Sequence, residues 1–193
     1  MNILDTLTSS ELKPFKTKSL SKGQVLFREN DKCEHVGIVS KGQIKIISYL
    51  ENGDEVIYNT INRDQMFGNN LIFSKEPYYK GNIITIEDSN VVLIKKKDLI
   101  KLLQTNESFM LKYFEIQADI AKTFNNKIKL LSMSSAEERF YFYMHENKNF
   151  ITISSINELA SQLFIKRETL SRLLSKLIKE KRIIKKSNTI KLI

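Results

Sequence analysis

The chain has 193 residues, 41% hydrophobic and 27% charged, which is ordinary for a globular protein of one or two domains. No apolar run approaches the roughly 18 residues of a membrane span, and residues 1–5 lack the basic and apolar regions of a signal peptide, which argues against membrane and secreted classes and predicts a cytoplasmic protein. A net charge of +9 indicates an anionic partner, while the single cysteine, Cys33, excludes an internal disulfide framework.

The first half of the sequence is a series of short β-rich stretches separated by turn residues. Strands are predicted at residues 24–27, 35–39, 43–49, 55–58, 82–86 and 90–94. Asn52-Gly53, between the third and fourth of these stretches, is the preferred two-residue turn of a β-hairpin. Several short strands at this spacing predict a β-sandwich or an antiparallel, jelly-roll-like β-roll over residues 1–106.

The hydrophobic period becomes helical after residue 97, and residues 107–133 carry a coiled-coil pattern. A seam with the spacing 4-3-4-3-4-3 is formed by Met110, Phe114, Gln117, Ala121, Phe124, Ile128 and Leu131. This spacing is typical of a two-stranded coiled coil, and a core helix of a monomer is the alternative. A strict seam over three heptads favours a second copy of the chain as the partner, with polar Gln117 helping to fix the register.

Residues 134–193 follow the order of a winged helix-turn-helix. Ser155-Ile156-Asn157-Glu158 is a capping box, in which the Ser hydroxyl and the Glu carboxylate each satisfy a backbone N–H at a helix start. Apolar residues then recur at helical spacing at Ile156, Leu159, Ala160 and Leu163. After a break at Phe164-Ile165, the buried stripe of a second helix is Leu170, Leu173, Leu174, Leu177 and Ile178. Residues 182–186 and 189–193 alternate around Ser187-Asn188, which predicts a β-hairpin as the wing.

The outward side of the second helix carries the candidate DNA-reading residues. These are Lys166, Arg167, Glu168, Ser171 and Arg172, and the wing adds Lys185 and Lys186. Arginine can pair bidentately with guanine, glutamate can accept from cytosine, and lysines suit phosphate contacts. Residues 134–193 hold 12 Lys/Arg against 6 Asp/Glu, a net charge of +6. A solvated basic face, RNA and an anionic membrane are the alternatives, and the helix-turn-helix pattern favours double-stranded DNA.

Four motifs, in matching order, resemble the CRP/FNR family of bacterial transcription regulators. Residues 167–174 (RETLSRLL) correspond to the recognition-helix pattern R-E-T-x-[GS]-R-x-L. The other matches are residues 40–45 (SKGQIK) to the hairpin signature, residues 64–68 (DQMFG) to the G-D-x-[FI]-G segment, and residues 135–139 (SAEER) to the A-E-x-R after the dimer helix. The resemblance implies an α+β fold with an N-terminal β-roll effector domain, a long dimerisation helix and a C-terminal winged helix-turn-helix.

The resemblance also implies a homodimer that reads a palindrome with half-sites like TGTGA or TTGAT. Arg167, Glu168 and Arg172 would contact base edges, and Ser171 would tune the choice. Because the motif mixes features of both half-site types, a preference centred on the shared TGA is expected. RNA polymerase is a further implied partner.

Two departures from the family pattern lie in the DNA module. Phe164 stands in the turn where relatives often carry Gly, which predicts a turn of different construction. Lys166 takes the usual Ser/Thr N-cap position of the recognition helix, which should weaken the cap by about 1 kcal/mol.

The ligand positions of cyclic-AMP-binding relatives are altered in this chain. The candidate effector-pocket residues are Gly68, Asn69, Asn70, Tyr79, Lys80, Phe124 and Asn125. The expected Glu after the Phe-Gly step is replaced by Asn69 and Asn70, and Lys80 offers a point charge where relatives have a planar Arg. Phe124 and Asn125 replace a Thr-Ser pair that reads adenine. Cyclic AMP is therefore not expected, and an unknown small-molecule effector or none are the open alternatives.

The sequence predicts no catalytic residue, cofactor or metal site. Cys33 alone cannot ligate an iron–sulfur cluster, and it is expected to be a small loop or core residue, with a redox thiol as the alternative. His35 and His145 are expected to be surface or packed imidazoles. A cupin-like small-molecule or metal-binding enzyme is the competing class, but such enzymes need two or more His plus a carboxylate. A regulator without an effector, with the β-roll as a dimer scaffold, is a third possibility.

Overall fold

The computed structural model describes residues 2–193 and contains two compact units. The first ends at Ala118 and the second begins at Asp119, so the boundary falls inside a long helix. Each unit has its own cluster of buried apolar side chains. Among the described residues, no helix combines the length and the apolar character needed to cross a membrane.

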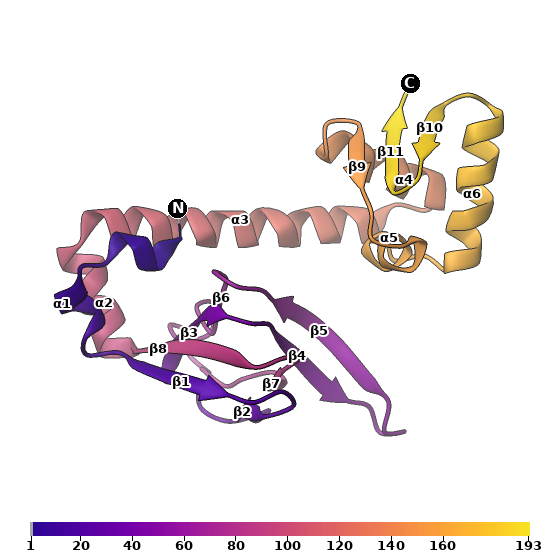
Figure 1. Ribbon diagram of the computed structural model, residues 1–193. Helices are drawn as coiled ribbons and strands as arrows, with labels where there is room; N and C mark the ends of the chain where they lie inside the picture. Colours follow the sequence, from indigo (N-terminus) through magenta and orange to yellow (C-terminus); the bar gives the residue numbers. More distant parts are fainter. Residues whose placement is uncertain (1) are drawn as a thin grey trace. The chain divides into compact units, whose positions relative to one another are not determined.

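Two four-stranded sheets form most of the first unit (Figure 1). One has the order β1-β8-β3-β6, built from β1 (Lys16–Leu20), β8 (Ser89–Lys95), β3 (His35–Lys41) and β6 (Met66–Phe67). The other has the order β2-β7-β4-β5, built from β2 (Val25–Phe27), β7 (Asn82–Thr85), β4 (Ile44–Tyr49) and β5 (Glu55–Ile61). All neighbours pair antiparallel. The predicted antiparallel β-roll is confirmed.

The strands that the sequence did not predict are the least apolar or the shortest. In β1 only Leu20 is buried, and β6 consists of two residues, so neither shows a readable alternation. The expected two-residue turn at Asn52-Gly53 is wrong. β4 and β5 are joined by a longer loop, in which the Leu50 N–H donates to the Asp54 carbonyl at 2.9 Å and Gly53 takes a φ of +86°.

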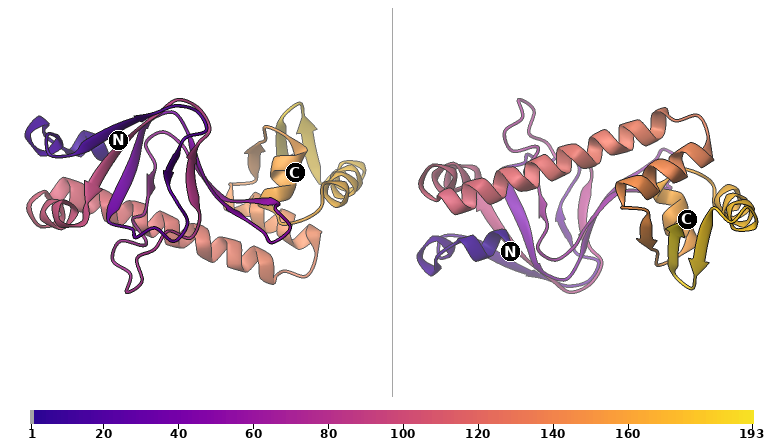
Figure 2. Two further views of the ribbon diagram at one scale, coloured as in Figure 1. Left: turned by 90° about the horizontal axis from the view of Figure 1, so that it is seen from below. Right: turned by 90° about the horizontal axis from the view of Figure 1, so that it is seen from above.

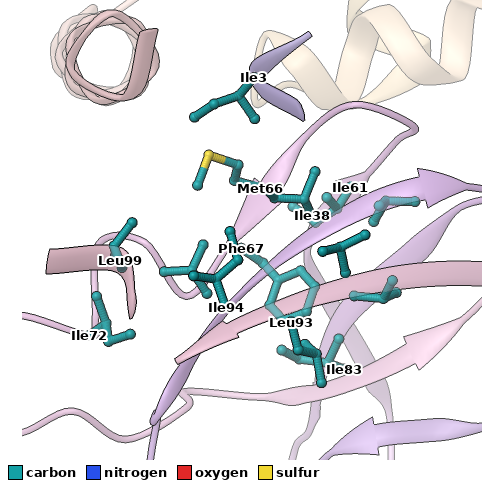
Figure 3. Packing of buried hydrophobic residues seen from close by; sticks show 14 of the residues in the cluster. Ile3, Ile38, Ile61, Met66, Phe67, Ile72, Ile83, Leu93, Ile94 and Leu99 are labelled. Atoms are coloured by element: carbon teal, nitrogen blue, oxygen red, sulfur yellow. The ribbon is translucent and has the colours of Figure 1, made fainter. Parts of the chain in front are cut away.

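The core of the first unit fills the space between the two sheets and continues under its helices. Figure 3 shows Phe67, Leu93 and Ile83 directed toward one another between the sheets. The short helices η1 (Ile3–Thr6) and α1 (Ser9–Leu12) begin with complete capping boxes. Ile3 of η1 and Leu99 of α2 (Lys96–Thr105) are at most 1% exposed, so both helices are anchored to the β-roll.

The helix α3 (Glu107–Ser132) is continuous over 26 residues and has two different faces. One face enters the cores of the chain, through Phe109 and Tyr113 in the first unit and Leu130 in the second. The predicted seam is largely exposed, with Phe114, Phe124, Ile128 and Leu131 between 52% and 65% exposed. Ala121 is also exposed, whereas Met110 and Gln117 are partly buried. One face of α3 therefore packs into the cores of the chain, while another face carries a solvent-exposed apolar seam.

The second unit combines helices with a three-stranded sheet in the order β10-β11-β9. Its elements are α4 (Ala136–Glu146), β9 (Phe150–Thr152), α5 (Ile156–Gln162), α6 (Arg167–Lys179), β10 (Ile183–Lys186) and β11 (Thr189–Leu192). Figures 1 and 2 both show α6 beside the β10–β11 hairpin. The predicted winged helix-turn-helix is confirmed, and β9, which the sequence did not predict, pairs with β11 as a third strand.

Two local expectations in this unit are corrected. Ser155 caps α5 by accepting from the Glu158 N–H at 3.1 Å, as predicted, but the Glu158 carboxylate accepts from the Ser154 hydroxyl, so the reciprocal half of the capping box differs. Ile178 is 44% exposed and does not belong to the buried stripe of α6. It lies in the last turn of that helix, where the core side is already covered by Leu174 and Leu177.

Candidate DNA-binding interface

The outward face of α6 brings the predicted reading residues together. Leu170, Leu173, Leu174 and Leu177 are buried in the core of the second unit and fix the rotation of the helix. Arg167, Glu168, Ser171 and Arg172 are all exposed. Because residues one turn apart lie on the same side of a helix, these four side chains form one polar strip. The strip combines two guanidinium donors, a carboxylate acceptor and a hydroxyl, which are the groups that read base edges in the major groove.

The start of α6 is weakly capped, as the sequence predicts. Lys166 is the N-cap residue, with extended backbone angles, and within residues 2–193 its side chain makes no capping hydrogen bond. The N–H groups of the first helical turn carry a partial positive charge, which Glu168 in that turn complements. The N-terminal end of α6 is therefore an exposed, donor-rich end next to the polar strip.

The turn between α5 and α6 keeps the left-handed conformation that glycine favours. Phe164 has a φ of +54°, and its N–H donates to the Ser161 carbonyl at 3.1 Å, while the Ile165 N–H donates to the Ala160 carbonyl at 3.0 Å. Phe164 therefore adopts the backbone conformation that glycine favours, and the expectation of a turn built differently from that of relatives stays a prediction. Left-handed backbone is costly for a bulky residue, so surrounding contacts must hold it. One of these comes from Arg139, whose Nη1 donates to the Phe164 carbonyl at 2.8 Å.

A group of charges joins α6 and the wing to α4. The Glu137 carboxylate accepts from Lys176 Nζ at 2.9 Å and from Arg182 Nη1 at 2.7 Å. The Arg182 guanidinium also lies 4.8 Å from the centroid of the Tyr141 ring. The hydrogen bond from Lys176, followed by that from Arg182, holds the pKa of the Glu137 carboxyl below its usual range. This cluster orients the C-terminal half of α6 and the start of the hairpin, and no motif in the sequence identified it.

The wing presents its lysines on two faces. Lys185 pairs with Ile190 and Lys186 pairs with Thr189, and both lysines are exposed. Adjacent residues of a strand point to opposite faces, so these two lysines are directed differently. Lys191, which was not among the predicted site residues, is exposed on β11 and lies opposite Ile184 and Phe150. The alternation of the hairpin residues is a signal that could have identified it.

Among the effector-pocket candidates of the first unit, Asn69 is held by hydrogen bonds to two side chains of α3. Asn69 is 4% exposed; its Nδ2 donates to Gln117 Oε1 at 2.9 Å, and its carbonyl accepts from Gln117 Nε2 at 3.3 Å. The Tyr113 hydroxyl donates to the same carbonyl at 3.2 Å. The preceding Gly68 has a φ of +75°, and a Cβ there would lie 2.8 Å from the His35 carbonyl. Gln117 thus bonds within its own chain, a role that its seam position did not indicate.

Of the remaining effector-pocket candidates, one is buried with a hydrogen bond of its own and the others named here are exposed. Tyr79 is buried, its hydroxyl donates to the His35 carbonyl at 3.2 Å, and burial raises the pKa of that hydroxyl above its usual range. Asn70 and Lys80 are exposed. Phe124 and Asn125 are exposed on the part of α3 that belongs to the second unit.

Cys33 is buried and His35 is partly buried, whereas His145 is exposed. Cys33 is 2% exposed, its Sγ donates to the His35 carbonyl at 3.5 Å and to the Gly68 carbonyl at 3.6 Å, and burial raises the pKa of the thiol. This fits the expected small core residue. Burial also lowers the pKa of the His35 imidazole. Across the described residues, no group of three or more His, Cys, Asp or Glu is placed to hold a metal ion.

An antiparallel β-roll, a long helix with an open apolar seam and a winged helix-turn-helix together define a class of two-part DNA-binding regulators. Residues 17–106 match the family model of the cyclic nucleotide-binding domain. The chain is 27% identical to the HTH-type transcriptional regulator ArcR of Staphylococcus epidermidis, over 91% of this chain and 83% of that protein. It is 24% identical to the anaerobic regulatory protein of Bacillus subtilis, over 84% and 73%. These matches to a cyclic nucleotide-binding domain and to named transcription regulators agree with the resemblance of the sequence to the CRP/FNR family of bacterial transcription regulators.

Solved structures share the fold over the length of the chain. One is CprK in complex with OCPA, with a TM-score of 0.74, 15% identity and coverage of 100% of this chain and 89% of that chain. Another is a CooA mutant from Carboxydothermus hydrogenoformans, with a TM-score of 0.70, 18% identity and coverage of 100% and 91%. At these identities the likeness describes the architecture alone.

Proposed function

We propose that this cytoplasmic regulator binds a palindromic DNA site as a homodimer. In this proposal residues 1–106 are a sensor-like domain, residues 107–133 a dimerisation helix and residues 134–193 the DNA-binding domain. The observation that carries it is the exposed strip of Arg167, Glu168, Ser171 and Arg172 on α6, held in place by a buried leucine stripe. Two such helices, one from each copy, would enter successive major grooves one helical turn apart.

The homodimer is supported by the seam on α3. Phe114, Phe124, Ile128 and Leu131 are each more than half exposed, and all follow the coiled-coil spacing. Exposed apolar side chains that continue along one helix face are typical of an interaction surface rather than of a monomer surface. The α3 helix of a second copy has the same seam spacing, so the two seams can pair along their length.

The half-site preference follows from the reading strip. Arg167 and Arg172 can each pair bidentately with guanine, and Glu168 can accept from the cytosine amino group. The resemblance of this strip to both TGTGA- and TTGAT-reading relatives supports a site centred on TGA, with Ser171 tuning the flanking base. RNA polymerase is the proposed protein partner of the DNA-bound dimer.

Control by cyclic AMP is not part of this proposal. The side chain at position 69 is a buried amide that donates to Gln117, and the backbone carbonyl of the same residue accepts from Gln117 and Tyr113. Lys80 is an exposed lysine rather than an arginine. These features support a regulator that either needs no effector or takes a ligand other than cyclic AMP.

The test is fluorescence-anisotropy titration of the purified, ligand-free protein against a TTGA-centred palindrome and a scrambled duplex. The titrations are repeated over a salt series and with cyclic AMP. We expect tight binding to the palindrome, unchanged by cyclic AMP. The Arg172→Ala variant should lose roughly 1–3 kcal/mol per protomer, because one bidentate base contact is removed from each half-site. Equal affinity for both duplexes, in the presence and absence of cyclic AMP, would contradict the proposed half-site.

A further inference from the structure

Arg139, in the first half of α4, donates hydrogen bonds to backbone carbonyls from two distant segments of the second unit. Its Nη1 donates to the Phe164 carbonyl at 2.8 Å and to the Leu163 carbonyl at 3.4 Å. Its Nε and Nη2 donate to the Met133 carbonyl at 3.2 and 3.1 Å, and Nη2 also lies 3.5 Å from the Leu131 carbonyl. One planar side chain therefore connects the end of α3 to the turn of the helix-turn-helix.

Both groups of carbonyls belong to helix ends that need donors. The last four carbonyls of an α-helix have no partner within the helix, and the helix dipole places partial negative charge there. Leu131 lies in the last turn of α3, and Met133 follows the helix. Leu163 is the C-cap of α5, and Phe164 follows it in left-handed backbone. A permanently charged group with five N–H donors can satisfy both ends at once.

The position of the turn decides where the recognition helix begins. Only Ile165 and the N-cap residue Lys166 separate Phe164 from Arg167, the first residue of α6. The Phe164 backbone is held in a costly conformation, so a fixed hydrogen bond to its carbonyl directly restrains the path of the chain into α6. The same guanidinium bonds to the end of α3 and to this turn, so it links the two directly.

We infer that Arg139 is a positioning residue for DNA recognition, which sets the start of α6 relative to the C-terminal end of α3 and thereby the half-site spacing that the dimer accepts. This inference rests on the proposed homodimer. In a dimer joined along α3, the separation of the two recognition helices depends on how firmly each is attached to the end of that helix. The Arg139 bonds are the part of this attachment that reaches both the end of α3 and the turn before α6.

Lysine is the informative replacement, because it keeps the charge but offers a single ammonium in place of the planar fork. We compare the wild type with Arg139→Lys, Arg139→Gln and Ile183→Val. The last variant removes a methylene from a buried residue of β10, so it lowers stability without touching the turn. Each protein is titrated against palindromes with zero, one or two base pairs added between the half-sites. Each added pair separates the half-sites by about 3.4 Å and rotates them by about 34°.

We expect the wild type and Ile183→Val to lose at least about tenfold in affinity for the first added base pair, whereas both Arg139 variants lose less than about threefold. Correspondingly, the Arg139 variants bind the best palindrome more weakly than the wild type, with binding to a scrambled duplex unchanged, since the phosphate contacts are retained. A wild-type spacing profile in Arg139→Lys overturns the inference, and so does a profile that flattens equally in Ile183→Val.

Hydrogen exchange of the free protein separates this inference from the proposed function. The Phe164 and Ile165 amides, which donate to Ser161 and Ala160, report the turn without DNA. If the wild type shows no preference for any palindrome, the proposed function fails, and hydrogen exchange alone then tests the positioning role of Arg139. Faster exchange of these two amides in Arg139→Lys than in Ile183→Val then supports the positioning role, and equal exchange overturns it.

Discussion

At the scale of single residues, Phe164 is the clearest case of a side chain placed against its own backbone preference. Its φ of +54° lies where left-handed backbone is costly for L-residues and not for glycine. We expect Phe164→Gly to be more stable than Phe164→Ala by about 1 kcal/mol, because both variants remove the ring and only glycine relieves the left-handed backbone. Urea unfolding of the two variants measures the difference. Equal stability would show that the turn relaxes to another conformation in the variants.

Glu137 makes the stability of the second unit depend on pH. Its folded pKa lies below the ordinary value of a glutamate, chiefly because Lys176 and then Arg182 donate to it. A depressed carboxyl pKa adds stability that is fully present above the unfolded value of about 4.3 and is lost as the pH falls through the folded value. We expect Glu137→Gln to melt below the wild type at pH 6, and we expect this difference in Tm to shrink as the pH falls below about 4. A constant difference in Tm across this range would contradict the ion-pair assignment.

The sequence predicts the role of a residue when that role depends on its near neighbours in the chain. Arg167 and Arg172 are identified by helical spacing, because the leucine stripe that starts at Leu170 defines the opposite, buried side of the helix. Asn69 and Arg139 could not be assigned their contacts in this way. The partners of Asn69 lie more than 40 positions away, and Arg139 bonds to backbone carbonyls, which every residue carries. Tertiary hydrogen bonds of this kind leave no periodic signal.

At the scale of elements, α3 has to serve two purposes along its length. Tyr113 and Leu130 are buried in the chain's own cores, while Phe124 is 52% exposed on the seam. We expect Phe124→Lys to raise the dimer dissociation constant at least about tenfold, since burying a Phe side chain is worth about 1.5–3 kcal/mol. Thr123→Lys places the same charge one position off the seam and serves as the control. Sedimentation equilibrium measures both, and equal dissociation in the two variants would contradict the predicted seam.

Element boundaries were predictable where the pattern is long and strong. The strands at 35–41 and 89–95 each contain four consecutive buried residues, and both were identified with nearly correct ends. By contrast, β1 reads Lys-Thr-Lys-Ser-Leu and pairs with β8 through its backbone, so its sequence resembles a loop. Similarly, Asn52-Gly53 forms a turn within a longer loop, because the Asn52 side chain accepts from the Asp54 N–H at 3.1 Å. Pairing and loop length depend on partners that a single segment does not contain.

At the scale of the whole molecule, charge is divided unequally between the two ends of the chain. Residues 134–193 carry a net +6 out of the total of +9. We expect Lys185→Gln combined with Lys186→Gln to lower the slope of log Kd against log salt by about 0.9 for each phosphate that is no longer neutralised, on palindromic and scrambled duplexes alike. Lys101→Gln, on α2, removes a charge outside this region and should leave the slope unchanged. An equal change in both would mean that general charge, not the wing, sets the salt dependence.

The buried thiol of Cys33 makes it possible to measure local opening of the β-roll by chemical labelling. Because the side chain is 2% exposed and its pKa is raised, an alkylating reagent reaches it only when the surrounding strands separate. The labelling rate therefore measures how often this region opens, and a small molecule that binds the closed form slows labelling by the factor 1 + [L]/Kd. With one cysteine in the chain, the protection of a single peptide in mass spectrometry would rank candidate metabolites without any knowledge of the DNA site.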